Sequence, residues 1–143
     1  MRLVVDANIL VGELLRARGR ALVADSRLEL FIAGRAWGET QHELRRRVRL
    51  FTERRGLDHG ALGELLDLAV AAAERHVTVV DADEYGGFED EARWRIPRDP
   101  DDWPTVALAL ALAADIWTAD GDFLGCGVAT WTTETLVTRL ETH

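Results

Sequence analysis

Short apolar runs alternate with longer segments of helical periodicity along the whole chain, and this alternation constrains the fold most strongly. The runs are four to six residues long and rich in β-branched or aromatic residues, which is typical of buried strands. We predict strands over residues 3–6, 28–33, 77–80 and 116–119, with 127–130 as a further candidate. Strands that alternate with helices build a parallel α/β sheet.

The segments between the runs carry apolar residues at helical spacing. We predict helices over residues 8–18, 20–26, 36–55, 58–75, 104–114 and 132–141, with 81–95 helical but broken at Gly86 and Gly87. Gly19 and Gly56 stand where two of these helices are expected to end, because glycine is a common helix terminator. No repeat or linker is visible, so residues 1–143 are expected to form a single domain.

The composition bounds the class of protein. With 143 residues, of which 48% are hydrophobic, the chain has enough apolar content for one core. Cys126 is the only cysteine, which excludes an internal disulfide and a cysteine-based zinc cage. The longest run of low charge, residues 103–114, is too short to cross a bilayer. We therefore expect a cytoplasmic protein with no membrane partner.

The charge is unevenly distributed. A formal net charge of −8 argues against nucleic acid as a partner, because phosphate binding normally requires a basic face. However, residues 35–55 are rich in arginine, and residues 81–122 are rich in aspartate and glutamate. A basic helix can coexist with an acidic pocket if that pocket holds cations, so nucleic acid remains a candidate partner.

Aspartates mark the ends of two predicted strands and the start of one helix. Asp6 ends the first strand, Asp102 precedes an alanine- and leucine-rich helix, and Asp120 and Asp122 follow the strand at 116–119. The carboxyl ends of parallel strands line one crevice. Carboxylates gathered there repel one another unless a cation lies between them, and hard oxygen ligands suit Mg²⁺ or Mn²⁺. The pattern indicates a metal-dependent enzyme of phosphoryl transfer.

Each aspartate also has a purely structural interpretation. Asp6, Asn8 and Asp102 are good helix N-caps, and the Asp-Gly pair at Asp120 is a strong turn signal. A strand-terminal aspartate followed two residues later by a second Asx residue is also found in phosphatases that use aspartate as nucleophile. The residues themselves leave these alternatives open.

The helix predicted over residues 36–55 offers two further acids and several arginines. Glu39 and Glu43 lie one turn apart on one face, where glutamates are usually solvated, and Glu43 can pair with Arg47 at i,i+4. Either glutamate can supply a carboxylate to the crevice. If Glu39 points into the crevice, Arg46 lies on nearly the same face of this helix. Arg46 is then the first candidate to contact a phosphate, and Arg35 is the second.

In order and spacing, the chain resembles the PIN-domain nucleases over essentially its whole length. That resemblance implies a strand ending in aspartate, a helix glutamate, a helix-opening aspartate and a T-x-D-x-D-F segment. The matching segments are VVDANIL with Asp6, DDWPTVALALAL with Asp102, and TADGDF with Thr118, Asp120, Asp122 and Phe123. For the helix acid, spacing from the run LFIA favours Glu39. Thr40 follows it where an aliphatic residue is usual, whereas Leu44 follows the alternative, Glu43.

The resemblance implies a three-layer α/β/α PIN-like fold with a central, mostly parallel sheet. It implies an endoribonuclease that depends on Mg²⁺ or Mn²⁺, similar to VapC-type toxins of toxin–antitoxin pairs, often homodimeric and inhibited by an antitoxin protein. The expected catalytic acids are Asp6, Glu39, Asp102 and Asp120, and the expected metal ligands are Asp6, Asp102, Asp120 and Asp122. The residues expected to contact RNA are Asn8, Thr118, Arg46 and Arg35. The alternatives are a catalytically silent RNA- or protein-binding module of the same fold and a phosphatase with Asp6 as nucleophile.

Overall fold

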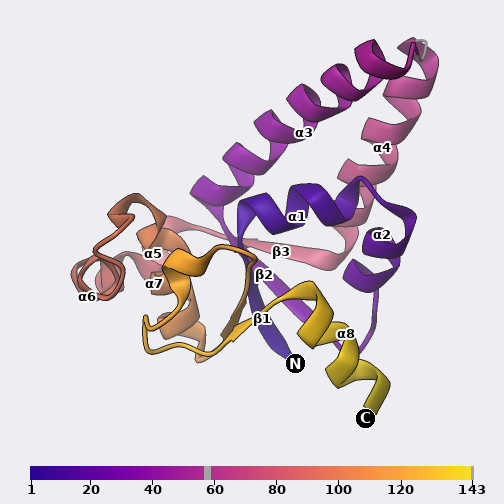
Figure 1. Cartoon of the computed structure of the whole chain (residues 1–143). Helices are drawn as coiled ribbons and strands as arrows, with labels where there is room; N and C mark the ends of the chain where they lie inside the picture. Colours follow the sequence, from indigo (N-terminus) through magenta and orange to yellow (C-terminus); the bar gives the residue numbers. More distant parts are fainter. Residues whose placement is uncertain (57–58, 143) are drawn as a thin grey trace.

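The computed structural model describes residues 1–56 and 59–142 and has a parallel sheet at its centre (Figure 1). Within those residues the sheet has five strands in the order β3-β2-β1-β4-β5. The strands are β1 (Arg2–Val5), β2 (Glu29–Ala33), β3 (Val77–Val80), β4 (Asp115–Trp117) and β5 (Thr130–Trp131). Helices cover both faces, which confirms the predicted three-layer α/β/α fold.

The helices lie close to the predicted segments. They are α1 (Ala7–Leu14), α2 (Ala17–Val23), α3 (Gly34–Arg55), α4 (His59–His76), α5 (Ala82–Tyr85), α6 (Glu89–Arg95), α7 (Trp103–Leu112) and α8 (Thr133–Thr142). The described residues also form three 3-10 turns, namely η1 (Gly86–Phe88), η2 (Pro100–Asp102) and η3 (Gly121–Phe123). The predicted start of the fourth helix at Asp58 lies outside the described residues.

The central strand β1 forms the middle of the core. Leu3, Val4 and Val5 are completely buried, because β1 is flanked by β2 and β4 and covered on both faces. This explains why residues 3–5 of β1 form an unbroken apolar run instead of an alternating one, as expected for a parallel sheet between two helical layers. The same burial leaves no room for a charged side chain until the strand ends at Asp6.

The strand order creates a crevice at the carboxyl end of β1. The chain goes from β1 to β2 on one side and returns to place β4 on the other, so the connections after β1 and β4 diverge. Such a switch point is where parallel α/β sheets bind their ligands. The backbone N–H of Asp6 donates to the carbonyl of Trp117 at 3.0 Å, which joins the two strand ends directly.

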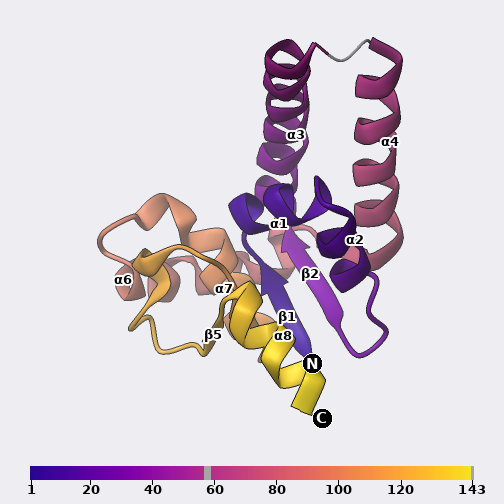
Figure 2. The ribbon, with the colours of Figure 1, turned by 45° about the vertical axis from the view of Figure 1, so that its right-hand side comes forward.

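Helices α3 and α4 extend side by side well beyond the sheet (Figures 1 and 2). The buried residues of α3 recur every four positions: Ala36, Thr40, Leu44, Val48 and Thr52. This single stripe is the face that packs on the rest of the protein. The helix ends at Gly56, whose φ of 63° is a left-handed conformation that favours glycine, as predicted from the sequence.

Gly19 does not end a helix, contrary to the sequence prediction. Helix α1 stops earlier, at Leu14, and Gly19 lies inside α2. A Cβ atom at Gly19 would overlap the backbone of Glu13. The glycine is therefore required for the close approach of α2 to the end of α1, which local sequence signals do not reveal.

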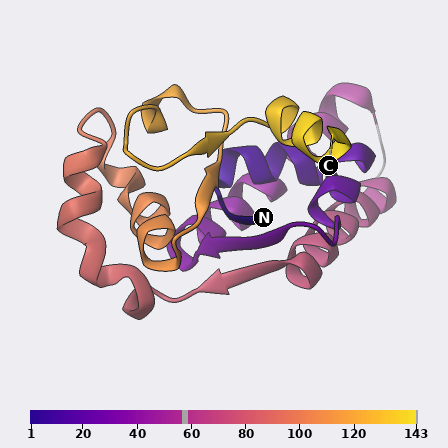
Figure 3. The same ribbon diagram turned by 90° about the horizontal axis from the view of Figure 1, so that it is seen from below.

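The two ends of the described chain lie close together, as Figure 3 shows from below. The N-terminal amine donates to the carbonyl of Arg27 at 2.6 Å, and the guanidinium of Arg27 donates to the carbonyl of Leu140 at 2.7 Å. Arg27 thus ties β1 and α8 to the loop before β2. In residues 1–56 and 59–142, no helix is both long and apolar enough to cross a membrane.

Candidate active site

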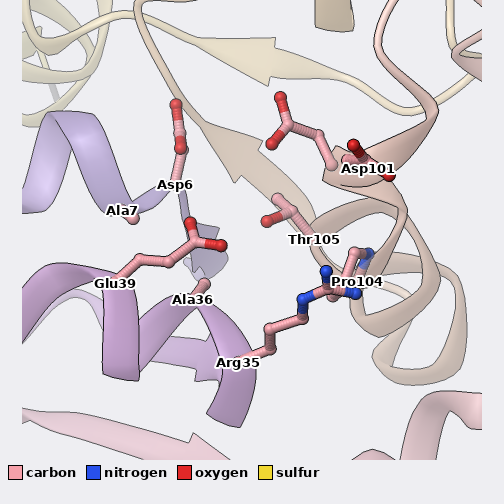
Figure 4. Close-up of a pocket in the computed structure, with 9 residues that line it drawn as sticks. Asp6, Ala7, Arg35, Ala36, Glu39, Asp101, Pro104 and Thr105 are labelled. Carbon is pink, nitrogen blue, oxygen red and sulfur yellow. The ribbon is translucent and has the colours of Figure 1, made fainter.

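A small cavity opens at the carboxyl end of β1, between the start of α1, the start of α3 and the start of α7 (Figure 4). Its lining residues are Asp6, Ala7, Arg35, Ala36, Glu39, Asp101, Asp102, Pro104 and Thr105. Three of the four predicted catalytic acids are among them. Residues far apart in the sequence therefore meet at the crevice that the strand order creates.

Asp6 is both a helix cap and a buried acid. It is the N-cap of α1, and its Oδ1 accepts a hydrogen bond from the backbone N–H of Asn8 at 3.4 Å. Its side chain is almost inaccessible, with a relative exposure of 7% for the residue. Burial raises the pKa of Asp6, hydrogen bonds from Thr118 and Asn8 oppose that rise, and the charges of Asp120 and Glu39 add to it. Helix capping accounts for the hydrogen bond with Asn8, but it does not account for the burial of Asp6, because N-cap side chains are usually exposed to solvent.

Thr118 links Asp6 to the segment after β4. Its hydroxyl donates to Oδ2 of Asp6 at 2.8 Å and accepts from the backbone N–H of Asp120 at 3.0 Å. Asp120 in turn accepts from the N–H of Asp122 at 2.9 Å, which forms the turn that the Asp-Gly signal predicted. Thr118 is buried and bonded on both sides, so its position favours a role in orienting Asp6 over the predicted contact with RNA.

Asp102 precedes α7 at the N-cap position, yet its side chain makes no capping hydrogen bond. Its pKa is raised to about 7, first by burial, then by the charges of Asp99, Asp6 and Asp120, and by a hydrogen bond with Asp99. The carboxylates of Asp6, Asp102 and Asp120 thus lie within electrostatic reach of one another. Capping alone does not account for Asp102.

The structure distinguishes the two candidate helix glutamates. Glu39 lines the cavity, and its charge acts on Asp6. Glu43 instead accepts hydrogen bonds from Arg46 at 2.9 Å and from Arg47 at 3.1 Å, outside the cavity. The position of Glu39 matches the one that spacing favoured.

Of the two candidate arginines, one also lies at the cavity and the other lies outside it. Arg35, in the first turn of α3, reaches toward the start of α7 on the same side of the cavity as Pro104 (Figure 4). Arg46, the first sequence candidate for a phosphate contact, forms an ion pair with Glu43 and does not line the cavity. Arg35 is therefore the arginine that the fold brings to the acids.

Besides Arg46, two predicted site residues do not join the cluster. The carboxylate of Asp122 neither lines the cavity nor perturbs Asp6 or Asp102, and Asn8 is exposed and contacts Asp6 through its backbone. Conversely, sequence reasoning missed Thr105, which is buried in the cavity wall. Thr105 lies three residues after Asp102, the N-cap of α7, and this spacing is the signal that would have indicated it, because an N-cap and the residue three positions later lie on the same side of the helix start.

The donor set of the cavity suits a hard divalent cation. Carboxylates come from three separate elements, and their mutual repulsion is the kind that a bound cation relieves. As the side chains lie in the described ranges, however, no three acidic, histidine or cysteine groups converge closely enough to hold an ion. Coordination by three of these acids requires their carboxylates to turn toward the centre of the cavity.

Comparison with known proteins gives both a family and a fold. The family model described as the PIN domain matches residues 4–141. A search of curated proteins found no match. Two solved structures are similar with a TM-score of 0.57 and 18% sequence identity over 92% of this chain: FitAcB from Neisseria gonorrhoeae, covered to 96%, and FitAB bound to the IR36 DNA fragment, covered to 94%. At that identity the likeness shows a shared fold alone.

Proposed function

The chain belongs to the PIN-domain family, and on that premise we propose that it is an endoribonuclease that requires Mg²⁺ or Mn²⁺. The observation that carries the proposal is the shared cavity of Asp6, Glu39 and Asp102, with Asp120 close enough to act on two of them. These acids come from separate elements and meet at the switch point of the sheet. Helix capping explains Asp6 in part and explains Glu39 and Asp102 not at all.

The four acids share one task in this proposal. Asp6, Glu39, Asp102 and Asp120 are the residues that would hold the cation. When bound, a divalent ion supplies a water of lowered pKa and positive charge for the leaving oxygen of a phosphodiester. Thr118 keeps the carboxylate of Asp6 in one orientation through its 2.8 Å hydrogen bond. No histidine is needed, and none of the histidines whose side chains the structure describes lines the cavity.

Arg35 gives the acidic cavity a complementary charge for RNA. Its guanidinium is exposed and lies beside carboxylates that would otherwise repel a phosphate. Guanidinium groups bind phosphate through short, charge-assisted hydrogen bonds. We propose that Arg35 binds the phosphate next to the cleaved bond, and that Arg46 contributes less because it is paired with Glu43 and lies outside the cavity.

We further propose that the enzyme is the toxin of a toxin–antitoxin pair, acts as a homodimer and is inhibited by an acidic protein. Support for the inhibitor comes from an apolar groove of about 470 Å³ between α1, α3 and α4. It is lined by Leu15, Arg47, Val48, Leu50, Phe51, Arg54 and Leu65. An amphipathic segment with acidic residues beside its apolar face matches both the floor and the arginine rim of this groove.

Cleavage of single-stranded and structured RNA tests the enzymatic proposal. Wild type is expected to cleave in Mn²⁺ and to stop when a chelator is added, whereas Asp102→Asn and Asp120→Asn are folded and inactive. Asp67→Asn makes the same chemical change on the exposed surface of α4 and is expected to cleave normally. A folded wild type that binds RNA without cutting it would instead establish a silent binding module. A phospho-aspartate trapped on Asp6 by a small phosphoester would establish the phosphatase.

The partner proposal has a separate test. Co-expression with the product of the adjacent upstream reading frame is expected to suppress the activity and to yield a stable complex. Phe51→Asp places a charge in the groove, far from the acids, and is expected to release the inhibitor while cleavage continues. If Phe51→Asp and wild type bind that product equally, the groove is not its binding site. Light scattering of the isolated protein tests the homodimer.

A further inference from the structure

Thr105 lies in the first turn of α7 and contributes a hydroxyl to the wall of the acidic cavity. Of the described residues that line the cavity, it is the only uncharged one whose side chain can form hydrogen bonds. The residue is 5% exposed. Its hydroxyl points into the cavity, toward the carboxylate of Glu39 on the opposite side (Figure 4). A buried hydroxyl with this direction is placed to contact a molecule that fills the cavity.

The hydroxyl of Thr105 differs from the other buried threonine hydroxyls in having no partner. In the described part of the chain four threonines are buried. Thr40 and Thr52 each donate to the carbonyl four residues earlier in α3, at 2.8 and 2.7 Å. Thr118 donates to Asp6 at 2.8 Å. The Thr105 hydroxyl alone forms no hydrogen bond with any residue in this part of the chain.

The position of Thr105 at the start of a helix explains why it lacks the usual partner. A helical threonine can donate to the carbonyl four residues earlier, but for Thr105 that residue is Asp101, which lies in η2 before α7 begins. A buried hydroxyl without a hydrogen bond destabilises the fold, whereas valine would fill the same space without that cost. The unpaired hydroxyl therefore points to a ligand that completes its hydrogen bonding.

The charges around Thr105 indicate the kind of ligand. Asp6 and Glu39 lie on one side of the cavity, whereas the guanidinium of Arg35 reaches to the α7 side, where Thr105 lies (Figure 4). The acids are the groups proposed to hold a cation. A guanidinium and a hydroxyl both donate hydrogen bonds, and phosphate oxygens accept them. The two donors therefore face the acids across the space that a phosphodiester occupies in the proposed function.

We propose that Thr105 is a substrate-binding residue, whose hydroxyl donates a hydrogen bond to an oxygen of the phosphate at which RNA is cleaved. Arg35 binds the neighbouring phosphate, and Thr105 holds the reacting one opposite Asp6 and Glu39. A hydroxyl suits this place because it adds a donor without adding a positive charge, and a positive charge would compete with the cation for the carboxylates. The inference rests on the proposed nuclease function.

Thr105→Val tests this role, because it removes the hydroxyl and keeps the shape of the side chain. RNA binding is measured in an Asp120→Asn background, which is expected to prevent cleavage and changes no residue that lines the cavity. We expect the Kd for single-stranded RNA to rise about ten-fold, as fits the loss of one hydrogen bond to a charged group. Thr105→Ser keeps the hydroxyl and is expected to bind RNA as its parent does. Thr105→Ala provides the same test as valine if the valine variant folds poorly.

A methylphosphonate at the phosphate that wild type cleaves tests the contact itself, because a methyl group replaces one non-bridging oxygen of that phosphate. We expect it to weaken RNA binding by the parent more than by Thr105→Val, since the valine variant has already lost the contact. At other phosphates the same replacement is expected to affect both proteins equally. Calorimetry without RNA is expected to show equal Mn²⁺ binding in wild type and Thr105→Val, which separates a contact with RNA from a contact with the cation site.

Thr52→Val is the matched control. It also removes a buried hydroxyl, but at the end of α3 away from the cavity, and is expected to lower stability without changing RNA affinity. If wild type cleaves RNA and Thr105→Val binds RNA as tightly as its parent, the proposed contact is wrong. It is also wrong if Thr105→Val weakens only Mn²⁺ binding, because the hydroxyl then acts on the carboxylate of Glu39. A wild type that neither binds Mn²⁺ nor cleaves RNA would overturn the proposed function itself.

Discussion

The hydroxyl of Thr118 donates a 2.8 Å hydrogen bond to Oδ2 of Asp6, two residues that lie 112 positions apart in the sequence. The bond spans the carboxyl ends of β1 and β4, the neighbouring strands at which the sheet reverses its order. Both residues are buried, so solvent does not replace the bond if it is lost. The orientation of the Asp6 carboxylate therefore depends on a threonine that also accepts a hydrogen bond from the backbone of Asp120.

Thr118→Val removes that donor while preserving the shape of the side chain. It leaves a buried carboxylate oxygen and the backbone N–H of Asp120 without their partner. We expect a loss of about 1–3 kcal/mol in the free energy of unfolding and weaker Mn²⁺ binding. Urea denaturation with a chelator, followed by Mn²⁺ titration, measures both. Thr118→Ser keeps the hydroxyl and is expected to retain Mn²⁺ binding; equal Mn²⁺ affinity in the valine variant and wild type would refute the role.

Glu39→Gln and Glu43→Gln form a matched pair one turn apart on α3. Glu39 lines the cavity, whereas Glu43 is occupied by Arg46 and Arg47. We expect Glu39→Gln to reduce cleavage at least about a hundred-fold, on the order of losing a group that acts on the reacting centre. Glu43→Gln is expected to cleave as wild type does and to lose only a partly exposed ion pair. The opposite ranking in an RNA cleavage assay would assign the site acid to Glu43.

Arg35→Ala and Arg46→Ala separate the two candidate phosphate contacts. Since Arg35 lies at the cavity and Arg46 is paired with Glu43, removal of Arg35 is expected to weaken RNA binding more. The slope of log affinity against log salt is expected to fall by roughly one counterion for Arg35→Ala and by less for Arg46→Ala. Titrations of a catalytically inactive Asp102→Asn background over a range of salt give both slopes. A larger change for Arg46→Ala would place the RNA along the exposed face of α3.

The acidic cluster predicts an unusual pH dependence of the metal-free protein. The pKa of Asp102 is raised from 3.8 to about 7, mainly by burial, so the folded state binds this proton more tightly than the unfolded chain. The stability that Asp102 contributes is thus complete below about pH 4 and is lost as the pH rises through about 7. Relative to Asp102→Asn, the wild type is expected to become less stable over that window in thermal melts with a chelator. Parallel curves for the two proteins would contradict this assignment.

The affinity for Mn²⁺ is expected to increase with pH, whereas the stability of the metal-free protein decreases. Because a metal ligand must be deprotonated, the affinity rises as the pH increases through the same window. Asp6 shifts in the same direction as Asp102 and strengthens the effect. Calorimetric titrations at several pH values measure it, and proton release on binding at low pH is the accompanying signature.

The elements that were predictable from sequence are those whose signals are local. Residues 77–80 form the strand that their β-branched run predicts, and Gly56 ends α3 as expected. Gly19 was misassigned because its role is a contact between two helices, namely the close approach of α2 to the backbone of Glu13 in α1. The short η turns are also difficult to predict, because tertiary packing determines them and they follow no periodic sequence pattern.

In the candidate site, too, the residues with local sequence signals were predictable and the contacts between separate segments were not. Spacing within one element located Asp6, Asp102 and Asp120, because each stands at the end of a recognisable segment. The hydrogen bond between Thr118 and Asp6, and the position of Thr105 opposite Glu39, involve segments that only the sheet order brings together. Periodicity identifies which side chains share a face of one element, but it does not identify partners on different elements.

The central claim is that Asp6, Glu39, Asp102 and Asp120 hold a divalent cation. Anomalous diffraction from crystals soaked in Mn²⁺ tests it most directly. We expect a peak in the cavity at coordination distance, about 2.0–2.3 Å, from an oxygen of Asp6 and from at least one other of these carboxylates. The claim would be contradicted by a map in which Mn²⁺ is bound only elsewhere. It would also be contradicted by a map without Mn²⁺ in which Asp6 still caps α1 and Glu39 remains apart from Asp102.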